Sequence, residues 1–121
     1  MGQCILVVED QEDNRQILRD LLTFSGFEIV EATDGAQALD AITKRRPDLI
    51  LMDIQLPVMD GYEATRRIKG DPATKDIPII VVTSYALSGD EAKARAVGSD
   101  DYVAKPFSPR VLLAKIREYL D

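Results

Sequence analysis

Short hydrophobic runs alternate with amphipathic stretches along the whole chain. The runs cover residues 4–8, 28–32, 48–52, 77–83 and 101–104, and each is expected to be a β-strand. Residues 4–8 and 49–52 are continuously hydrophobic. This pattern is typical of strands that are buried on both faces, as in a parallel sheet.

The amphipathic stretches predict five helices, at residues 13–25, 35–46, 60–70, 89–97 and from 109 onwards. Gly26 and Gly98 are stop signals, Pro47 closes the second helix, and Ser108-Pro109 opens the last. The residues predicted to face inward are Ile17, Leu18, Leu21 and Leu22 in the first helix, Ala38, Leu39, Ala41 and Ile42 in the second, and Val111, Leu112, Ile116, Tyr119 and Leu120 in the last. Strict alternation with right-handed crossovers predicts a doubly wound open α/β sheet.

The fourth predicted helix differs from the others because its hydrophobic residues are mostly alanines. They are Ala92, Ala94 and Ala96, followed by Val97. Each alanine buries little area, so we expect this helix to be held more loosely than the last one. A tightly packed interface of small residues is the alternative.

Composition limits the class of protein. The 121 residues are 45% hydrophobic and contain no linker, internal repeat or low-complexity segment, so residues 1–121 are expected to form one domain. The single cysteine, Cys4, cannot form an internal disulfide. Neither a membrane-spanning run nor a signal peptide is found, and a cytoplasmic protein without membrane insertion is therefore expected.

Charge narrows the function further. The net charge is −6, and the only local basic cluster is Lys44, Arg45 and Arg46, which we interpret as a solvated helix end. Direct binding of nucleic acid is not expected, because it needs clustered lysine and arginine. The absence of histidine removes the most common general base and metal ligand.

Polar residues follow four of the predicted strands: Glu9 and Asp10, then Asp53, Thr83 and Lys105. The carboxyl ends of strands meet at one edge of a parallel α/β sheet, so these side chains are expected to converge. Three carboxylates repel one another, and Mg²⁺ (or Mn²⁺) together with the lysine ammonium would relieve the repulsion. With a hydroxyl to bond an oxyanion, the combination suits phosphoryl transfer to a carboxylate.

Four segments strengthen this interpretation. They are VVED at 7–10 with Asn14 and Arg15 following, LMDIQLPVMDG at 51–61, VVTS at 81–84, and GSDDYVAKPF at 98–107. Together and in this order they resemble the response-regulator receiver domain of two-component signalling, of the single-domain type. The resemblance covers essentially the whole chain. It implies a flavodoxin-like five-stranded sheet in the order 2-1-3-4-5.

The resemblance implies that Asp53 accepts a phosphoryl group from a histidine of a partner kinase or phosphotransfer protein. Asp10, Asp53 and the backbone carbonyl of Gln55 would bind Mg²⁺ directly. Glu9 would act through a metal-bound water. Glu9 stands where many relatives carry Asp, and its extra methylene still allows that role.

The resemblance also implies a response to phosphorylation. Thr83 and Lys105 would bond phosphoryl oxygens, and the peptide bond before Pro106 would be cis. Movement of Thr83 would let the aromatic switch residue Tyr102 turn inward and reshape the face of helix four, strand five and helix five. The residues expected on this face are Lys93, Arg95, Tyr102 and Arg110. A protein effector would bind there, and the chain would be a monomer or a phosphorylation-dependent dimer.

Two further positions border the expected path of the hydrolytic water. Gln55 and Tyr85 lie two residues beyond Asp53 and Thr83. A bulky Tyr85 would shield the acyl phosphate, so slow self-dephosphorylation is our hypothesis. Ser84, next to Thr83, resembles the alanine that is common in the family.

Three alternatives stay open at the level of sequence. A haloacid-dehalogenase-like phosphatase needs a second aspartate two residues after its nucleophile, where this chain has Gln55, and its nucleophile normally follows the first strand. A dinucleotide-binding or flavodoxin-like module needs a glycine-rich phosphate loop, but residues 9–13 are acidic. A receiver fold kept only as a docking adaptor would not need the acidic pocket.

Overall fold

Parallel strands form the centre of the molecule in a computed structural model that describes residues 2–83 and 90–120. They are β1 (Cys4–Val8), β2 (Glu28–Ala32), β3 (Leu49–Asp53), β4 (Ile79–Thr83) and β5 (Asp101–Ala104). Within the described residues they form one five-stranded sheet in the order β2-β1-β3-β4-β5, and each neighbouring pair is parallel. The predicted doubly wound sheet and its strand order are confirmed.

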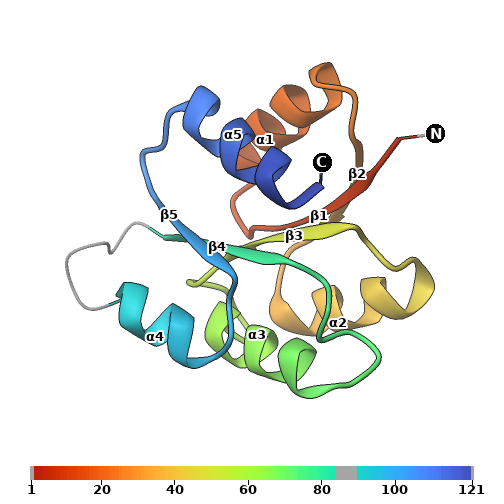
Figure 1. The fold of residues 1–121 in the computed structure, drawn as a ribbon, viewed down its shortest axis with the longest axis vertical. Coiled ribbons are helices and arrows are strands. Elements are labelled where there is room, and N and C mark those ends of the chain that lie inside the picture. The colour runs from red at the N-terminus through yellow and green to blue at the C-terminus, as the bar shows by residue number, and fades with distance from the viewer. Residues whose placement is uncertain (1, 84–89, 121) are drawn as a thin grey trace.

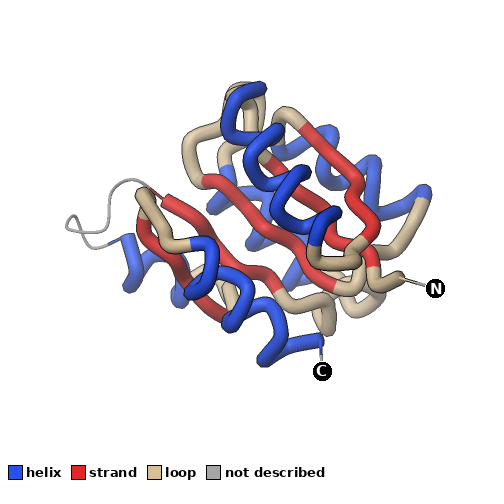
Figure 2. Tube along the Cα trace, turned by 90° about the horizontal axis from the view of Figure 1, so that it is seen from above, coloured by secondary structure: helices blue, strands red, loops and turns tan. Residues whose placement is uncertain are grey.

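Helices cover both faces of this sheet. They are α1 (Glu12–Phe24), α2 (Gly35–Lys44), α3 (Gly61–Gly70), α4 (Asp90–Ala96) and α5 (Pro109–Leu120). Helices α1 and α5 lie over one face, and α2, α3 and α4 lie over the other (Figure 1). Seen from above, α1 and α5 lie in front of the strands (Figure 2). Among the described helices, none is long and apolar enough to cross a membrane.

Each face of the sheet has its own hydrophobic core. The α1 and α5 face packs around Leu18, Leu22, Leu112 and Ile116, and the opposite face around Ala38, Ile42, Ala64 and Ile68. Strands β1, β3 and β4 are buried at every position, which explains their continuous hydrophobicity. Burial of each Leu or Ile contributes about 1.5–3 kcal/mol, so the central strands form the rigid frame of the protein.

Two residues that were predicted to face inward are exposed. Ile17 in α1 is 58% exposed and Val111 in α5 is 50% exposed, whereas the next residues, Leu18 and Leu112, are buried. A helix on a sheet buries a narrow stripe, and one residue turns the side-chain direction by about 100°. The predicted stripes of α1 and α5 are therefore too wide. The other predicted inward residues are buried or partly buried against the cores: Leu21, Leu39, Ala41, Tyr119 and Leu120 are of the second kind.

The strand starts also differ from prediction. β4 begins at Ile79 rather than Ile77, because Pro78 has no N–H for the ladder. β3 covers Leu49–Asp53, one residue later than expected. Asp48 lies outside the strand, where its side chain binds the backbone of β1.

Aspartates close the edge where the strands begin, here called the amino edge. The Asp48 carboxylate accepts a hydrogen bond from the Cys4 N–H at 2.7 Å, and the Asp48 N–H donates to the Cys4 carbonyl at 2.7 Å. Asp100 repeats this arrangement with Ile79, at 2.8 and 2.9 Å. The Nζ of Lys69 lies 2.7 Å from the Asp100 carboxylate. Each aspartate therefore satisfies the first N–H of a neighbouring strand.

A third aspartate of the amino edge has several partners. Asp101 accepts hydrogen bonds from the Tyr102 N–H at 2.8 Å, from Lys115 Nζ at 3.1 Å and from the Tyr119 hydroxyl at 3.3 Å. Burial would raise the pKa of the Asp101 carboxyl, but these donors outweigh burial and hold it below its usual value.

Helix α4 buries one of its alanines. Ala94 packs in the core beneath α2, α3 and α4, while Ala92 and Ala96 are exposed. Gly89, the predicted first residue of this helix, lies outside the described residues. The looser attachment of α4 stays a prediction.

Candidate functional site

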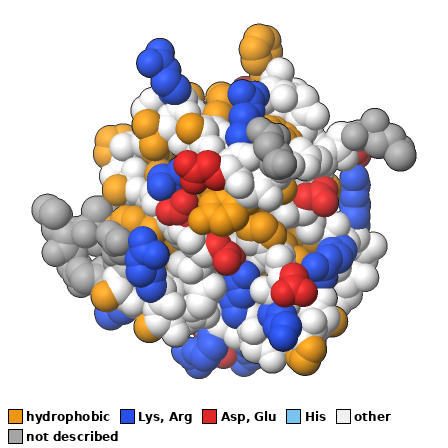
Figure 3. Space-filling view, viewed as in Figure 1, with side chains coloured by type: hydrophobic (Ala, Val, Ile, Leu, Met, Phe, Trp, Pro, Cys, Tyr) orange, Lys and Arg blue, Asp and Glu red, His pale blue; other side chains and the backbone are white. Residues whose placement is uncertain are grey.

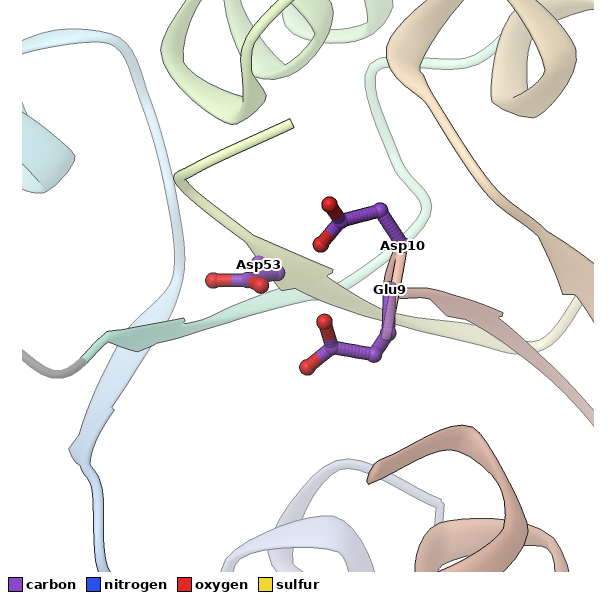
Figure 4. A group of neighbouring side chains, drawn as sticks. All are labelled: Glu9, Asp10 and Asp53. Carbon is purple, nitrogen blue, oxygen red and sulfur yellow. The ribbon is translucent and has the colours of Figure 1, made fainter. Parts of the chain in front are cut away.

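Three carboxylates meet where β1 and β3 end, at what we call the carboxyl edge. One oxygen from each of Glu9, Asp10 and Asp53 lies within 4.8 Å of the others. Glu9 and Asp10 reach toward Asp53 from opposite sides of the sheet (Figure 4). Glu9 is only 2% exposed and Asp53 only 8%, so water screens their repulsion poorly.

Helix α3 fixes the backbone of Asp53. The Asp60 side chain caps α3 by accepting from the Glu63 N–H at 2.9 Å. The Gly61 N–H donates to the Ile54 carbonyl at 2.9 Å. A Cβ at Gly61 would lie 2.0 Å from the carbonyl oxygen of Asp53. Only glycine permits this approach, and α3 therefore packs directly on the backbone of Asp53.

The loop between β3 and α3 contains a strained turn. The Met59 N–H donates to the Pro57 carbonyl at 2.6 Å and closes a γ-turn around Val58, whose φ is 66°. A β-branched residue rarely adopts this conformation. The Gly35 N–H donates to the Met59 carbonyl at 3.0 Å and holds the turn against the start of α2. The loop that carries Gln55 is thus held in a strained shape by its neighbours.

Lys105 brings a positive charge to the three carboxylates. Its Nζ lies 2.7 Å from Glu9 Oε1 and 3.4 Å from Asp53 Oδ2. Across residues 2–83 and 90–120, it is the one cationic side chain bonded to these carboxylates. The Lys105 N–H donates to the carbonyl of Thr83, which is buried at the end of the strand beside β3. The Lys105–Pro106 peptide bond is cis.

Glu9 and Asp53 differ in proton affinity. Burial raises the pKa of the Asp53 carboxyl to about 6, and the negative charge of Glu9 adds to the effect while Lys105 opposes it. Burial would also raise the pKa of Glu9, but hydrogen bonds from Lys105 and the Gln11 N–H outweigh it and hold that pKa below its ordinary value. For Lys105, burial is outweighed by Glu9 and Asp53, and its pKa is raised. Lys105 is therefore the closer and stronger partner of Glu9, and compensates the charge of Asp53 to a lesser degree.

These residues fit a hard divalent cation. The cluster offers carboxylate oxygens from three side chains, and one ammonium leaves part of their negative charge uncompensated. Both oxygens of Glu9 already accept hydrogen bonds, from Lys105 and from the Gln11 N–H at 3.1 Å. Within the described chain, no hydrogen bond to the Asp10 carboxylate is found. Asp10 and Asp53 are thus better placed than Glu9 to bind a cation directly.

Other predicted site residues lie near the carboxylates or outside the described chain. Gln55 is exposed in the loop after β3. Tyr102 in β5 is half-buried against the core on the α2, α3 and α4 side, and its hydroxyl oxygen is buried. Its reorientation stays a prediction. Ser84 and Tyr85, and with them the shielding hypothesis, lie outside the described residues.

Two donors to Glu9 were not found by sequence reasoning. The Gln11 backbone N–H binds its carboxylate, and the side chain of Arg15 donates to its carbonyl at 2.8 Å. Every residue except proline has a backbone N–H, so the residue type at position 11 gives no sign of this hydrogen bond. Arg15 was noticed only as part of a motif, without a role.

An open groove of about 530 Å³ adjoins the carboxylates on the α1 and α5 side. Its apolar walls include Ile17, Leu18, Pro106 and Phe107. Ile17, whose exposure was not expected from the sequence, therefore lines a groove next to the carboxylates.

A doubly wound parallel sheet with buried acidic groups and a lysine at its carboxyl edge defines an α/β protein with a candidate cation site at that edge. Residues 5–117 match the family model described as the response regulator receiver domain. The chain belongs to this family and is a receiver domain of two-component signalling. Members of the family are regulatory domains rather than metabolic enzymes, which argues against the phosphatase and dinucleotide-binding alternatives.

Relatives and solved structures agree with this assignment. The polar-differentiation response regulator DivK of Brucella anthropi is 42% identical over 120 residues, which cover 99% of this chain and 98% of that protein. The receiver domain of the sensor histidine kinase PA1611 from Pseudomonas aeruginosa, solved with a magnesium ion coordinated in its active site cleft, is 38% identical, with a TM-score of 0.93 and coverage of 99% and 98%. The chemotaxis protein CheY4 of Vibrio cholerae is 30% identical, with a TM-score of 0.91 and coverage of 98% and 99%.

Proposed function

We propose that Asp53 accepts a phosphoryl group from a phosphohistidine of a histidine kinase or phosphotransfer protein, in a Mg²⁺-dependent reaction. The observation that carries the proposal is the position of Asp53, which shares a buried acidic pocket with Glu9 and Asp10 and lies 3.4 Å from Lys105. Residues 1–121 act in this proposal as one receiver domain.

In the transfer step, an oxygen of the ionised Asp53 carboxylate attacks phosphorus. The P–O bond forms as the P–N bond to the donor imidazole breaks, and the bonding electrons return to the imidazole nitrogen. Lys105, already 3.4 Å from Asp53, is near enough to bond a phosphoryl oxygen. Thr83, at the end of the neighbouring strand, would donate its hydroxyl to another.

Asp10, Asp53 and the Gln55 carbonyl would hold the metal ion, which when bound supplies positive charge against the phosphoryl oxygens. Glu9 would contribute through water, because its two oxygens are engaged by Lys105 and Gln11. Glu9 also keeps the Lys105 ammonium close to the pocket.

Phosphorylation would act through Thr83 and Tyr102. The acyl phosphate adds negative charge and oxygens that need donors. Thr83 would move toward these oxygens, and the ring of Tyr102 would settle inward. The changed face of α4, β5 and α5, with Lys93, Arg95 and Arg110, would bind a downstream protein.

The groove beside Glu9 and Lys105 supports a protein as the phosphoryl donor, because its apolar walls lie next to the acceptor. No direct contact with nucleic acid or membrane is part of the proposal. Sedimentation with and without beryllium fluoride would decide between a monomer and a phosphorylation-dependent dimer.

Incubation with acetyl phosphate, with and without Mg²⁺, tests the proposal. Intact mass spectrometry should show a phosphoryl adduct that needs Mg²⁺ and disappears in Asp53→Asn. Asp101→Asn, which removes a carboxylate from the amino edge, is the matched control and should keep the adduct. An adduct that survives Asp53→Asn, or forms equally without metal, would refute the proposal.

A further inference from the structure

Arg15, in the first turn of α1, holds the turn that connects β1 to α1. Its side chain is 13% exposed. Its Nη1 donates to the Glu9 carbonyl at 2.8 Å, its Nε lies 3.3 Å from the Glu31 carboxylate of β2, and its Nη2 pairs with Glu12. One guanidinium therefore links the end of β1, the start of α1 and the edge strand β2.

The Glu9 carbonyl belongs to the peptide unit that joins Glu9 to Asp10. This unit is planar, so fixing its oxygen also fixes the nitrogen and Cα of Asp10. The preceding peptide is held too, because the Glu9 N–H donates to the Ala32 carbonyl at 3.0 Å. The peptide units on both sides of Glu9 are thus restrained. The Gln11 N–H, which donates to the Glu9 carboxylate at 3.1 Å, restrains the next peptide unit as well, so the Cα of Asp10 is held from both sides and with it the direction of its side chain.

Asp10 needs this support more than its neighbours do. Glu9 is held by Lys105 and Gln11 through its side chain, whereas no hydrogen bond to the Asp10 carboxylate is found in the described chain. The orientation of Asp10 therefore depends on its backbone. Groups behind a metal ligand typically change metal affinity about 10–100-fold when removed.

We infer that Arg15 is a positioning residue for metal binding, which orients Asp10 through the Glu9–Asp10 peptide. The inference rests on the proposed function, in which Asp10 binds Mg²⁺. It predicts that Arg15 governs metal affinity without touching the metal or the phosphoryl group.

Arg19 provides a matched control. It lies one helical turn further along α1 and pairs with the same two acids, Glu31 at 2.7 Å and Glu12 at 3.4 Å. It has no bond to the Glu9 carbonyl. Loss of the shared ion pairs is therefore common to both variants, and loss of the carbonyl bond is specific to Arg15.

The test is titration calorimetry of Mg²⁺ into the full chain and into Arg15→Ala, Arg15→Lys and Arg19→Ala. Arg15→Ala should weaken Mg²⁺ binding about 10-fold, Arg15→Lys less because it keeps a donor, and Arg19→Ala by less than about 2-fold. With acetyl phosphate, Arg15→Ala should raise the Mg²⁺ concentration for half-maximal phosphorylation and leave the rate at saturating Mg²⁺ nearly unchanged. Loss of structure alone would also lower the rate at saturating Mg²⁺.

Equal Mg²⁺ affinity in Arg15→Ala and Arg19→Ala would overturn the inference while leaving the proposed function intact. If Arg15→Ala does not fold, Arg15→Met against Arg19→Met makes the same comparison, because methionine keeps much of the aliphatic side chain and removes the donor; equal affinities there overturn the inference too. A wild-type chain that neither binds Mg²⁺ nor forms the adduct would overturn the proposed function itself.

Discussion

The amino edge and the carboxyl edge of the sheet both gather carboxylates at strand ends, but the partners of these carboxylates differ. At the amino edge, Asp100 and Asp101 each have a lysine and a backbone N–H. At the carboxyl edge, Glu9 and Asp53 share a single lysine, Lys105. On the face seen in Figure 3, acidic and basic side chains lie close to one another.

One aspartate of each edge, Asp101 and Asp53, has its pKa shifted in the opposite direction to the other. The pKa of Asp101 is held below its usual value by its donors, whereas burial and Glu9 raise the pKa of Asp53 to about 6. The same residue type thus stabilises one edge and carries uncompensated charge at the other. Within this pair, the aspartate with too few donors belongs to the candidate functional site, and the aspartate with sufficient donors stabilises the fold.

Removing the lysine at the carboxyl edge should have the largest effect on this contrast. Lys105→Met leaves Glu9 and Asp53 without a cation and should destabilise the metal-free protein by about 2 kcal/mol, less than for a fully buried ion pair because the Lys105 side chain is 19% exposed. Phosphorylation by acetyl phosphate should slow about 100-fold, as for loss of an oxyanion donor. Urea unfolding and adduct kinetics measure the two effects.

Lys115→Met is the corresponding change at the amino edge. Asp101 keeps the Tyr102 N–H and the Tyr119 hydroxyl, so the loss of stability should be about 1 kcal/mol or less. The phosphorylation rate should not change. Equal effects of the two lysine variants on phosphorylation would contradict the division between the edges.

Asp53→Asn should remove a pH dependence from folding stability. Because the folded-state pKa of Asp53 is raised above its ordinary value of 3.8, this group favours folding below that value, and the contribution is lost as pH rises through about 6. Without metal, the variant should be more stable than wild type near neutral pH by about 1 kcal/mol, after allowance for solvent screening. Urea unfolding at several pH values checks this, and an advantage that grows toward low pH would contradict it.

Asp100→Asn should weaken the amino edge without affecting the carboxyl edge. The amide oxygen can still accept from the Ile79 N–H, but the charge pair with Lys69 is lost. We expect a loss of about 1 kcal/mol and an unchanged Mg²⁺ dependence of phosphorylation. A changed Mg²⁺ dependence would show that the two edges are energetically coupled.

Val58→Gly should have the smallest effect. Glycine relieves the strain of a positive φ but costs about 0.5–1 kcal/mol in backbone entropy, so the net change in unfolding free energy should be within about 1 kcal/mol. Thermal unfolding measures it. A large destabilisation would mean that the exposed Val58 side chain makes contacts that matter.

The sequence predicts the sheet and the carboxyl edge well because both depend on short-range patterns. Continuous hydrophobic runs reveal β1 and β3, and the topology of parallel strands brings Glu9, Asp10 and Asp53 to one edge. The exposure of Ile17 was missed, because a periodic stripe does not show how much of a helix the sheet covers.

The amino edge was not predicted at all. Asp48 was predicted as the first residue of a strand and Asp100 lay outside every predicted element, and their bonds to Cys4 and Ile79 span 44 and 21 residues. Partners of this kind depend on strand order and register, which a single residue does not encode. The sequence did predict that the Lys105 ammonium would offset the charge of the strand-end carboxylates, but not that Glu9 would be its nearer partner.

The contact between Gly61 and the Asp53 carbonyl has a mechanical consequence. Since the first turn of α3 touches the acceptor backbone, strand and helix cannot slide past each other without a clash. The α3 side therefore restrains the backbone of Asp53. If Asp53 is phosphorylated as proposed, this contact would favour a structural response through β4 and β5 over one through α3.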